Sequence, residues 1–172
     1  RHADVAALLQ DLKALDRRGL DLRTIVVDNA STPALSELLP GAGADFEVLR
    51  LPENLGGSGG FNAGLRAALG PQRRSAWGRA PDFVWLLDSD VRVSPRALRR
   101  LWGALRARPD LVAAGAAIGE PASREAYEVG GRLSRVLGTY GPMARGRLDA
   151  RCIVDADYLS ACSLLVRADA VE

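Results

Sequence analysis

The sequence predicts an α/β fold, in which helices flank a mainly parallel central sheet, and three observations support this prediction. Short apolar runs rich in β-branched residues alternate along the chain with segments that have helical periodicity or helix caps. Polar and glycine-rich segments follow these runs directly, where parallel strands would end. The 172 residues, 48% of them hydrophobic, are enough for a single domain with its own core.

The individual elements are expected from local patterns. In residues 4–16, leucine and valine recur at helical spacing on one face, which indicates an amphipathic helix. Ser94 and Pro95 predict a helix start, because serine caps helices and proline suits the first helical position. The expected helices are 4–16, 34–39, 61–69 and 95–108, and the expected strands are 24–27, 46–49, 83–87, 111–118, 127–129 and 159–166.

Composition excludes several classes of protein. The net charge of +2 is too small to favour a nucleic-acid partner, and no apolar run has the ~18–20 residues that a membrane span needs. Cys152 and Cys162 alone cannot form a tetrahedral metal site or a secreted disulfide framework, which indicates a reducing, cytoplasmic location. Lys13 is the only lysine among 23 basic residues, a bias that we attribute to coding composition. The alternative is that the arginine-rich stretches 66–79 and 92–108 bind anionic lipid or phosphate.

Two carboxylates follow the expected strand 83–87. Asp88 and Asp90 are two residues apart, so in extended chain they point to the same side. Unpaired charges at that spacing are costly, and a divalent cation removes the cost. Carboxylate oxygens suit Mn²⁺ or Mg²⁺, which often share their coordination shell with substrate phosphates. The alternative is a solvated turn with an aspartate as a helix cap, but the position after a buried strand favours the metal site.

A glycine cluster, Gly56–Gly60, follows the expected strand 46–49. It matches neither of the common phosphate motifs, since Asn62 stands where the third glycine of G-x-G-x-x-G is required, and a P-loop would need Lys-Ser or Lys-Thr in place of Leu65-Arg66. It predicts a flexible loop that opens a helix and whose exposed N–H groups can receive an anion. The alternative, a tight turn with close helix packing, is favoured for this cluster taken alone.

Asp28 and Asn29 follow the expected strand 24–27. A carboxylate at this position can accept a hydrogen bond from the ring N–H of a pyrimidine base, and the Asn29 amide can also bind a nucleotide. The alternative is an Asx turn that leads into the helix after Pro33. For this feature taken alone, the turn is the favoured interpretation.

The three polar segments together resemble family 2 glycosyltransferases of the GT-A fold. The resemblance rests on the order and spacing of three motifs and on a later segment, residues 157–167, that is similar to the strand near the acceptor site. The Gly-Gly-Ser-Gly-Gly-Phe form of the loop and Glu128-Val129-Gly130-Gly131 resemble the galactofuranosyl- and rhamnosyl-transferring branch. The motifs are Val26-Val27-Asp28-Asn29-Ala30-Ser31-Thr32, Asn54-Leu55 with the glycines up to Gly64, and Trp85-Leu86-Leu87-Asp88-Ser89-Asp90.

The resemblance implies a Rossmann-like nucleotide-diphospho-sugar transferase fold and an inverting, metal-dependent transfer from a UDP- or dTDP-sugar. Asp28 would contact the base, and residues of the loop and first helical turn would lie along the nucleotide. Asp88 would lie near the ribose and the Mn²⁺ or Mg²⁺ ion, and Asp90 would be its principal ligand. The nucleotide-binding residues implied in this way are Asp28, Asn29, Asn54, Gly59, Gly60, Asn62 and Asp88.

The resemblance also implies a division of the chain. Residues 1–110 would form the nucleotide-sugar-binding half, and residues 111–172 the start of the acceptor-side half. Family members carry a strand before the first helix and a Glu-Asp motif beyond the last strand. We therefore expect the chain to be a fragment of one catalytic domain whose base lies beyond Glu172. Within the chain, Asp155 and Asp157 are the candidates for the base, although a solvated strand entry is the favoured interpretation for both.

The expected partners are a nucleotide-diphosphate sugar and a glycan or lipid-linked acceptor. The cell-envelope branch implies peripheral contact with the inner face of the plasma membrane. Two other functions stay open on the sequence. One is a nucleotide-sugar-binding module without turnover. The other is a nucleotidyltransferase, which would place a glycine loop with Arg or Lys directly after its first strand.

Overall fold

The computed structural model describes residues 2–39, 45–72, 77–120, 125–143, 146–147 and 153–171. The helices are α1 (His2–Lys13), α2 (Leu35–Leu38), α3 (Gly56–Leu69), α5 (Ala97–Ala107) and the 3-10 helix η1 (Ala168–Ala170). The strands are β1 (Ile25–Asp28), β2 (Glu47–Arg50), β3 (Phe83–Leu87), β4 (Ala113–Gly115), β5 (Ile118–Gly119), β6 (Glu125–Glu128), β7 (Gly131–Ser134), β8 (Thr139–Pro142), β9 (Gly146–Arg147) and β10 (Ser163–Arg167).

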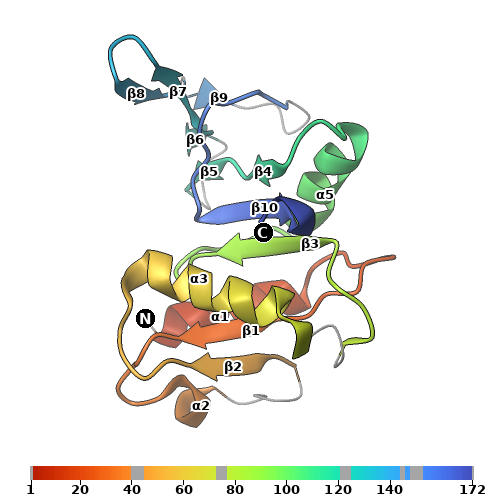
Figure 1. Ribbon diagram of the computed structural model, residues 1–172, viewed down its shortest axis with the longest axis vertical. Helices are drawn as coiled ribbons and strands as arrows, with labels where there is room; N and C mark the ends of the chain where they lie inside the picture. The colour runs from red at the N-terminus through yellow and green to blue at the C-terminus, as the bar shows by residue number, and fades with distance from the viewer. Residues whose placement is uncertain are drawn as a thin grey trace.

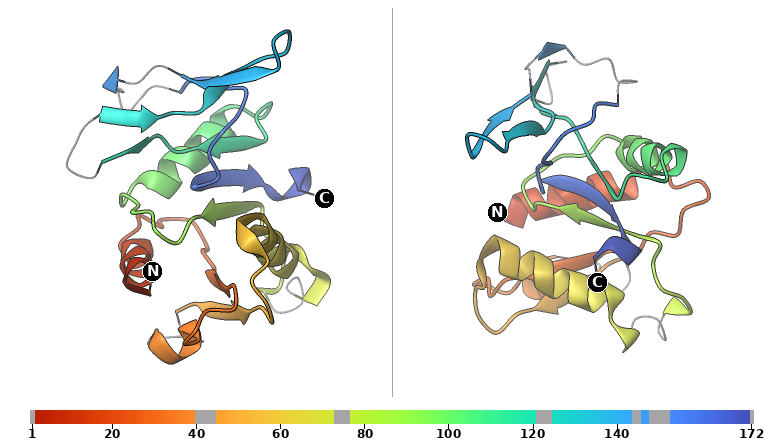
Figure 2. Two further views of the ribbon diagram at one scale, coloured as in Figure 1. Left: turned by 90° about the vertical axis from the view of Figure 1, so that its left-hand side faces the viewer. Right: turned by 45° about the horizontal axis from the view of Figure 1, so that its top comes forward.

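Strands β1–β4 and β10 form a layer between helices, and strands β5–β9 lie beyond it at the top of Figure 1, as Figures 1 and 2 show. Helix α3 covers one face and contacts both β1 and β3. Helices α1 and α5 lie on the other face, where their leucines form one buried cluster with Leu165 of β10. Leu105 and Leu165 are 0% and 2% exposed, so the centre of this cluster lies between α5 and β10. The α/β class is therefore as the sequence predicts.

The expectation of one mainly parallel sheet is not confirmed. Strands β1 and β2 form a parallel pair, whereas β10 lies between β3 and β4 and runs antiparallel to both. The antiparallel direction arises because the chain leaves the sheet after β4 and re-enters it through β10 at the same end, on the left in Figure 1. Local periodicity carries no information about strand direction, so the sequence pattern could not reveal this reversal.

Strands β1 and β3 each have one edge whose backbone N–H and C=O groups do not bond to the paired strand, β2 or β10, and these two edges face each other. The carbonyls of Thr24 and Asp28 accept hydrogen bonds from residues within and just after β2, so Ile25 and Val27 turn their N–H and C=O groups to the other side. In β3, Asp88 N–H donates to Cys162 and the even-numbered positions pair with β10, so the odd-numbered positions face away. Among the described residues β1 and β3 are not paired with each other, although Figure 1 shows them as neighbouring strands.

Several boundaries differ from the expectations. Helix α3 begins at Gly56, five residues earlier than the 61–69 expected, so the glycine cluster is helical. Helix α5 begins at Ala97 without a side-chain cap, because the Ser94 carbonyl accepts the Ala97 N–H in a backbone turn that also holds Pro95 against Asp16. The expected strand 111–118 is divided into β4 and β5, and 127–129 corresponds to β6. The hairpin β7–β8 falls in a region for which no strand was expected.

Candidate active site

The polar segments expected to carry function meet at one edge of the layer. Strands β1, β2 and β3 point in the same direction, and α3 begins at the edge where they end, on the left in Figure 1. The left panel of Figure 2 views this edge directly. Asp28, Asn29, Asn54 and Asp88 all lie at or just beyond strand ends here. The structure thus brings the three sequence motifs to the same edge, where α/β proteins bind ligands.

Hydrogen bonds from the side-chain amides of Asn29 and Asn54 connect the end of β1 to the start of α3. The Asn29 Nδ2 donates to the Asn54 Oδ1 at 3.0 Å and to the carbonyl of Gly56 at 3.0 Å. Asn29 Oδ1 accepts the Leu55 N–H at 2.9 Å, and Asn54 Oδ1 accepts the Gly56 N–H at 2.9 Å. Asn29 therefore fixes the position of the turn that opens α3.

The glycines at the start of α3 have two different roles. A Cβ at Gly59 would lie 2.4 Å from the Leu55 Cβ, and a Cβ at Gly64 would lie 3.1 Å from Val27, so these positions are closely packed. Gly57 is exposed, and a Cβ there would meet nothing within 4 Å. The close-packing alternative thus holds for Gly59 and Gly64. The helix N-terminus at Gly57 is accessible, and its N–H groups and positive dipole end suit an anion.

This difference predicts opposite effects of two alanine substitutions. Gly57→Ala should raise the free energy of unfolding by about 0.5–1 kcal/mol, because alanine loses less entropy than glycine in a helix and meets no neighbour. Gly59→Ala should lower it by about 1 kcal/mol or more, because the Leu55 side chain must move. Urea unfolding of both variants measures the difference. Equal effects of the two substitutions would contradict the assigned packing.

Asp28 is buried and engaged within the protein. It is 0% exposed. Its Oδ1 accepts the Ser31 N–H at 2.8 Å, and its Oδ2 accepts the Leu35 N–H at 3.1 Å and an Arg50 guanidinium N–H at 2.5 Å. Burial raises the pKa of Asp28, but the hydrogen bonds from Ser31, Leu35 and Arg50 outweigh it, and the pKa lies below its usual 3.8. The carboxylate is not open to a nucleobase here, and it holds the turn that leads into α2.

The segment after β3 presents its two carboxylates differently. Asp88 is half-buried and its N–H donates to the Cys162 carbonyl at 3.1 Å, whereas Asp90 is exposed. Two residues further, Arg92 donates through Nε and Nη2 to Asp11 of α1 at 2.6 and 2.7 Å. Asp11 also accepts the Val93 N–H at 3.1 Å. The segment that carries Asp88 and Asp90 is therefore fixed at both ends, to β10 and to α1.

The donor set at this edge fits a divalent cation that shares its coordination with a ligand. Asp88 and Asp90 offer carboxylate oxygens, one half-buried and one exposed. Within the described ranges no group of three or more His, Cys, Asp or Glu residues converges as a complete metal site. Mg²⁺ and similar hard cations commonly bind through one or two carboxylates together with substrate phosphates and waters. The two aspartates fit that mode of binding and do not fit a dedicated all-protein cage.

Cys162 belongs to this edge, although no local sequence pattern places it there. Ser160 Oγ lies 3.2 Å from Cys162 Sγ, and the strand register sets Cys162 opposite Asp88. The hydrogen bond with Ser160 lowers the pKa of the Cys162 thiol, but burial and the negative charges of Asp88 and Glu128 together raise it. The raised pKa shows that the Cys162 thiol lies near the negative charges of Asp88 and Glu128. This proximity depends on the pairing of β3 with β10, which the sequence does not specify.

The Cys162 environment predicts slow alkylation. Cys152 lies outside the described residues, so the test uses a Cys152→Ser background. There, Cys162 should react with iodoacetamide at pH 8 more slowly than a free thiol, because less of it is thiolate. Asp88→Asn should lower the thiol pKa and speed the reaction, since a negative neighbour is removed. Asp82→Asn, at the other end of β3, is the matched control. An unchanged pH profile of alkylation in the Asp88 variant would contradict this assignment.

The remaining predicted residues are distributed more widely. Asn62 is exposed in the second turn of α3, and Gly60 lies beside Asn29, because a Cβ at that glycine would be 3.6 Å from the Asn29 Nδ2. Asp155 is exposed and pairs with Arg108 at 3.7 Å. Asp157 accepts the Leu133 N–H at 2.9 Å and lies 3.9 Å from Arg132, so it holds the base of the β7–β8 hairpin.

Comparison with known proteins assigns the family. The model of the family "Glycosyl transferase family 2" matches residues 2–167, nearly the whole chain. The chain therefore belongs to glycosyl transferase family 2, which implies the GT-A fold of nucleotide-sugar transferases. This membership confirms the resemblance drawn from the three motifs and favours glycosyl transfer over nucleotidyl transfer.

One curated relative supports the finer resemblance. The chain is similar to galactofuranosyltransferase GlfT1 of Mycolicibacterium smegmatis, with 38% identity over 68 residues. The aligned region is 40% of this chain and 20% of that relative, so the chain matches about a fifth of the relative's length. No solved structure matches the chain.

Proposed function

We propose that the chain transfers a sugar from a UDP- or dTDP-linked donor to an acceptor hydroxyl, with inversion of the anomeric centre and with a divalent cation. The observation that carries this proposal is the arrangement of Asp88 and Asp90 at the same edge as the accessible start of α3. Carboxylates there can hold a cation, and a helix N-terminus can receive the diphosphate. Membership of glycosyl transferase family 2 supports a donor of the nucleotide-sugar class.

Each residue at the edge has a proposed part in binding the donor. The N–H groups around Gly57 receive the diphosphate, and the exposed side chains of Asn54 and Asn62 lie along the nucleotide. Asp88 and Asp90 hold Mn²⁺ or Mg²⁺, and such an ion supplies Lewis-acid stabilisation of the leaving diphosphate. Since the Asp28 carboxylate is fully engaged, we propose that it positions Ser31 and Asn29 at the base end of the site without itself touching the base.

An inverting transfer also needs a base for the acceptor hydroxyl. Asp155 and Asp157 are exposed and paired with arginines, and Asp157 has a structural hydrogen bond to the hairpin. Exposed ion pairs of this kind contribute only about 0–1 kcal/mol, so Asp155 and Asp157 stay the proposed candidates for the base within the described residues. The proposed acceptor is a glycan or a lipid-linked sugar of the cell envelope, and the proposed location is the inner face of the plasma membrane. No helix in the described ranges is long and apolar enough to cross a membrane.

Calorimetric titration with UDP, dTDP, CDP and GDP, each with and without Mn²⁺, tests the proposal. We expect UDP or dTDP to bind more tightly than CDP and GDP, and we expect Mn²⁺ to strengthen binding of the diphosphates but not of uridine. Equal affinity for all four nucleotides, or affinity indifferent to Mn²⁺, would contradict the proposed donor.

A further inference from the structure

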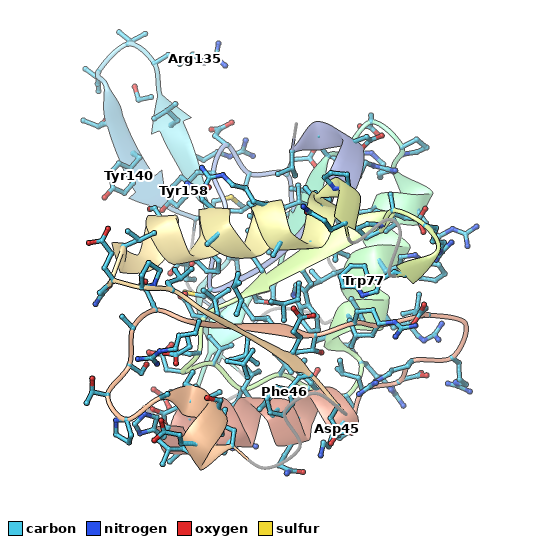
Figure 3. The ribbon with its side chains drawn as sticks, turned by 60° about the horizontal axis from the view of Figure 1, so that its bottom comes forward. Asp45, Phe46, Trp77, Arg135, Tyr140 and Tyr158 are labelled. Atoms are coloured by element: carbon cyan, nitrogen blue, oxygen red, sulfur yellow. The ribbon has the colours of Figure 1, made fainter. Side chains whose placement is uncertain are left out.

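The β7–β8 hairpin, residues 131–142, projects from one end of the molecule's long axis (Figure 1). Its strands pair in regular antiparallel register from Gly131 opposite Pro142 to Ser134 opposite Thr139. The residues of the turn between the strands are all exposed. Figure 3 shows Arg135 at the outer end of the hairpin and Tyr140 near its base.

The base of the hairpin is firmly attached to the segment before β10. Gly131 N–H donates to the Tyr158 carbonyl at 3.1 Å, and the Asp157 N–H donates to the Gly131 carbonyl at 2.8 Å. The rings of Tyr140 and Tyr158 pack edge to face with centroids 5.5 Å apart, as seen in Figure 3. A Cβ at Gly131 would lie 2.0 Å from the Tyr158 ring, so only glycine allows this packing. The hairpin therefore presents its tip on a fixed support.

The tip of this supported hairpin is apolar. Val136 and Leu137 are 94% and 76% exposed, and Leu133 and Tyr140 on the strands are 49% and 73% exposed. Two adjacent aliphatic side chains at such exposure are costly in water unless something covers them. The contacts of Gly131, Asp157 and Tyr158 are all at the base of the hairpin, so they do not cover Val136 and Leu137 at its tip.

The segment that contains the tip carries only positive charges. Residues 129–148 contain Arg132, Arg135, Arg145 and Arg147 and no aspartate or glutamate. In the arginine-rich stretch 92–108, three arginines are paired with acids of the same chain: Arg92 with Asp11, Arg99 with Asp16, and Arg108 with Asp110. Half of the arginines in 92–108 are thus engaged within the fold. In the hairpin, Arg132 at the base lies 3.9 Å from Asp157, whereas Arg135 lies beside the exposed Val136 and Leu137, in a segment without acidic residues.

We propose that the tip of the β7–β8 hairpin inserts Val136 and Leu137 into the interfacial region of an anionic lipid bilayer, with Arg135 at the level of the headgroups. Apolar side chains beside arginine suit this interface, where the aliphatic groups leave water and the guanidinium groups meet phosphates. A protein partner fits less well, because specific interfaces bury about 800 Å² on each side and the tip offers two aliphatic side chains. This proposal deepens the membrane contact of the proposed function but does not depend on the donor.

Vesicle co-sedimentation of the full chain tests the proposal, with phosphatidylcholine vesicles that contain or lack phosphatidylglycerol. We expect binding to the anionic vesicles only, weakened by salt. The double variant Val136→Asp/Leu137→Asp should reduce binding at least about 10-fold, since it removes the buried aliphatic groups and adds repulsion. The matched control Leu38→Asp/Val112→Asp makes the same charge change at other exposed apolar positions, 41% and 58% exposed, and should bind nearly as the unmodified chain does.

The charge contribution is measured separately. Arg135→Gln should weaken vesicle binding about five-fold, and Arg96→Gln, at an exposed position before α5, should weaken it less. Circular dichroism of each variant establishes folding, and Arg135→Gln provides the test if the double aspartate variant does not fold. UDP binding should be unchanged in all hairpin variants, so a failure of the donor proposal would show itself independently.

Three outcomes would overturn the membrane proposal. The first is equal binding to neutral and anionic vesicles. The second is equal loss in the hairpin variant and in the Leu38/Val112 control. The third is concentration-dependent self-association, measured by sedimentation velocity, that the Val136/Leu137 variant abolishes, because the tip would then be covered by a second copy of the chain.

Discussion

Asp90→Asn is expected to lower the affinity for UDP in the presence of Mn²⁺ at least about 10-fold, which is about 1.4 kcal/mol of binding free energy. Asparagine keeps the shape of the side chain but removes the charge that attracts the cation. Asp90 is exposed, so the substitution leaves no buried group without a partner. Calorimetric titration of UDP and uridine, each with and without Mn²⁺, separates the metal-dependent part of binding from the rest.

Asp82→Asn is the matched control, because Asp82 is an exposed carboxylate just before the opposite end of β3, paired with Arg79 at 3.4 Å. It should leave both titrations unchanged. Uridine affinity should also be unchanged in the Asp90 variant, since uridine has no diphosphate to share the cation. If UDP affinity in Mn²⁺ is the same in the Asp90 variant and in the unmodified chain, Asp90 does not hold the metal.

Asp28→Ala is expected to lower the free energy of unfolding by about 2–4 kcal/mol, because it removes the acceptor of three hydrogen bonds in a buried position. The N–H groups of Ser31 and Leu35 would lose their partner, and the Leu35 side chain is itself buried. The matched control is Asp21→Ala, since Asp21 is 60% exposed and forms a surface ion pair with Arg23. Such pairs contribute about 0–1 kcal/mol. Urea unfolding of both variants measures the contrast, and equal losses would contradict the structural role of Asp28.

The same residue predicts an acid-dependent loss of stability. Because hydrogen bonds hold the pKa of Asp28 below 3.8 in the folded chain, its contribution is fully present above that pH and is lost as the pH falls through the folded pKa. Asp28→Asn should therefore flatten the dependence of unfolding free energy on pH below about 4. Some dependence of the unfolding free energy on pH should remain in this variant. The pKa of Asp11 is also lowered, chiefly by its hydrogen bond with Arg92, so Asp11 contributes to stability in the same way.

The sequence predicts the burial and position of residues whose surroundings are set by their neighbours in the chain. The apolar spacing in residues 4–16 correctly predicts an amphipathic helix, and its valine and leucines form the buried face of α1, because helical periodicity alone decides which side chains share a face. The position of Asp88 and Asp90 directly after strand β3, whose residues are half-buried, also followed from local order alone. The predicted start of α3 lies five residues too late, because glycine is a poor helix former and the packing of Gly64 against Val27 of β1 is a tertiary contact.

Residues whose environment depends on distant segments could not be predicted. Asp28 is engaged by Arg50, 22 residues away, and this pairing exists only because β1 and β2 are parallel and in register. Cys162 lies opposite Asp88 only because β10 returns antiparallel to β3. The β7–β8 hairpin has no alternation of apolar and polar residues, since both its faces are largely exposed, so the usual strand signal is missing.

The proposed function places the nucleotide-diphosphate donor where α3 begins and β3 ends. Amide hydrogen exchange, followed by mass spectrometry with and without UDP and Mn²⁺, tests this placement most directly. We predict slower exchange in residues 56–60 and 88–90 when both ligands are present, and little change in α5 or the β7–β8 hairpin. Slower exchange confined to α5 or the hairpin, under conditions in which UDP is bound, would contradict the proposed site.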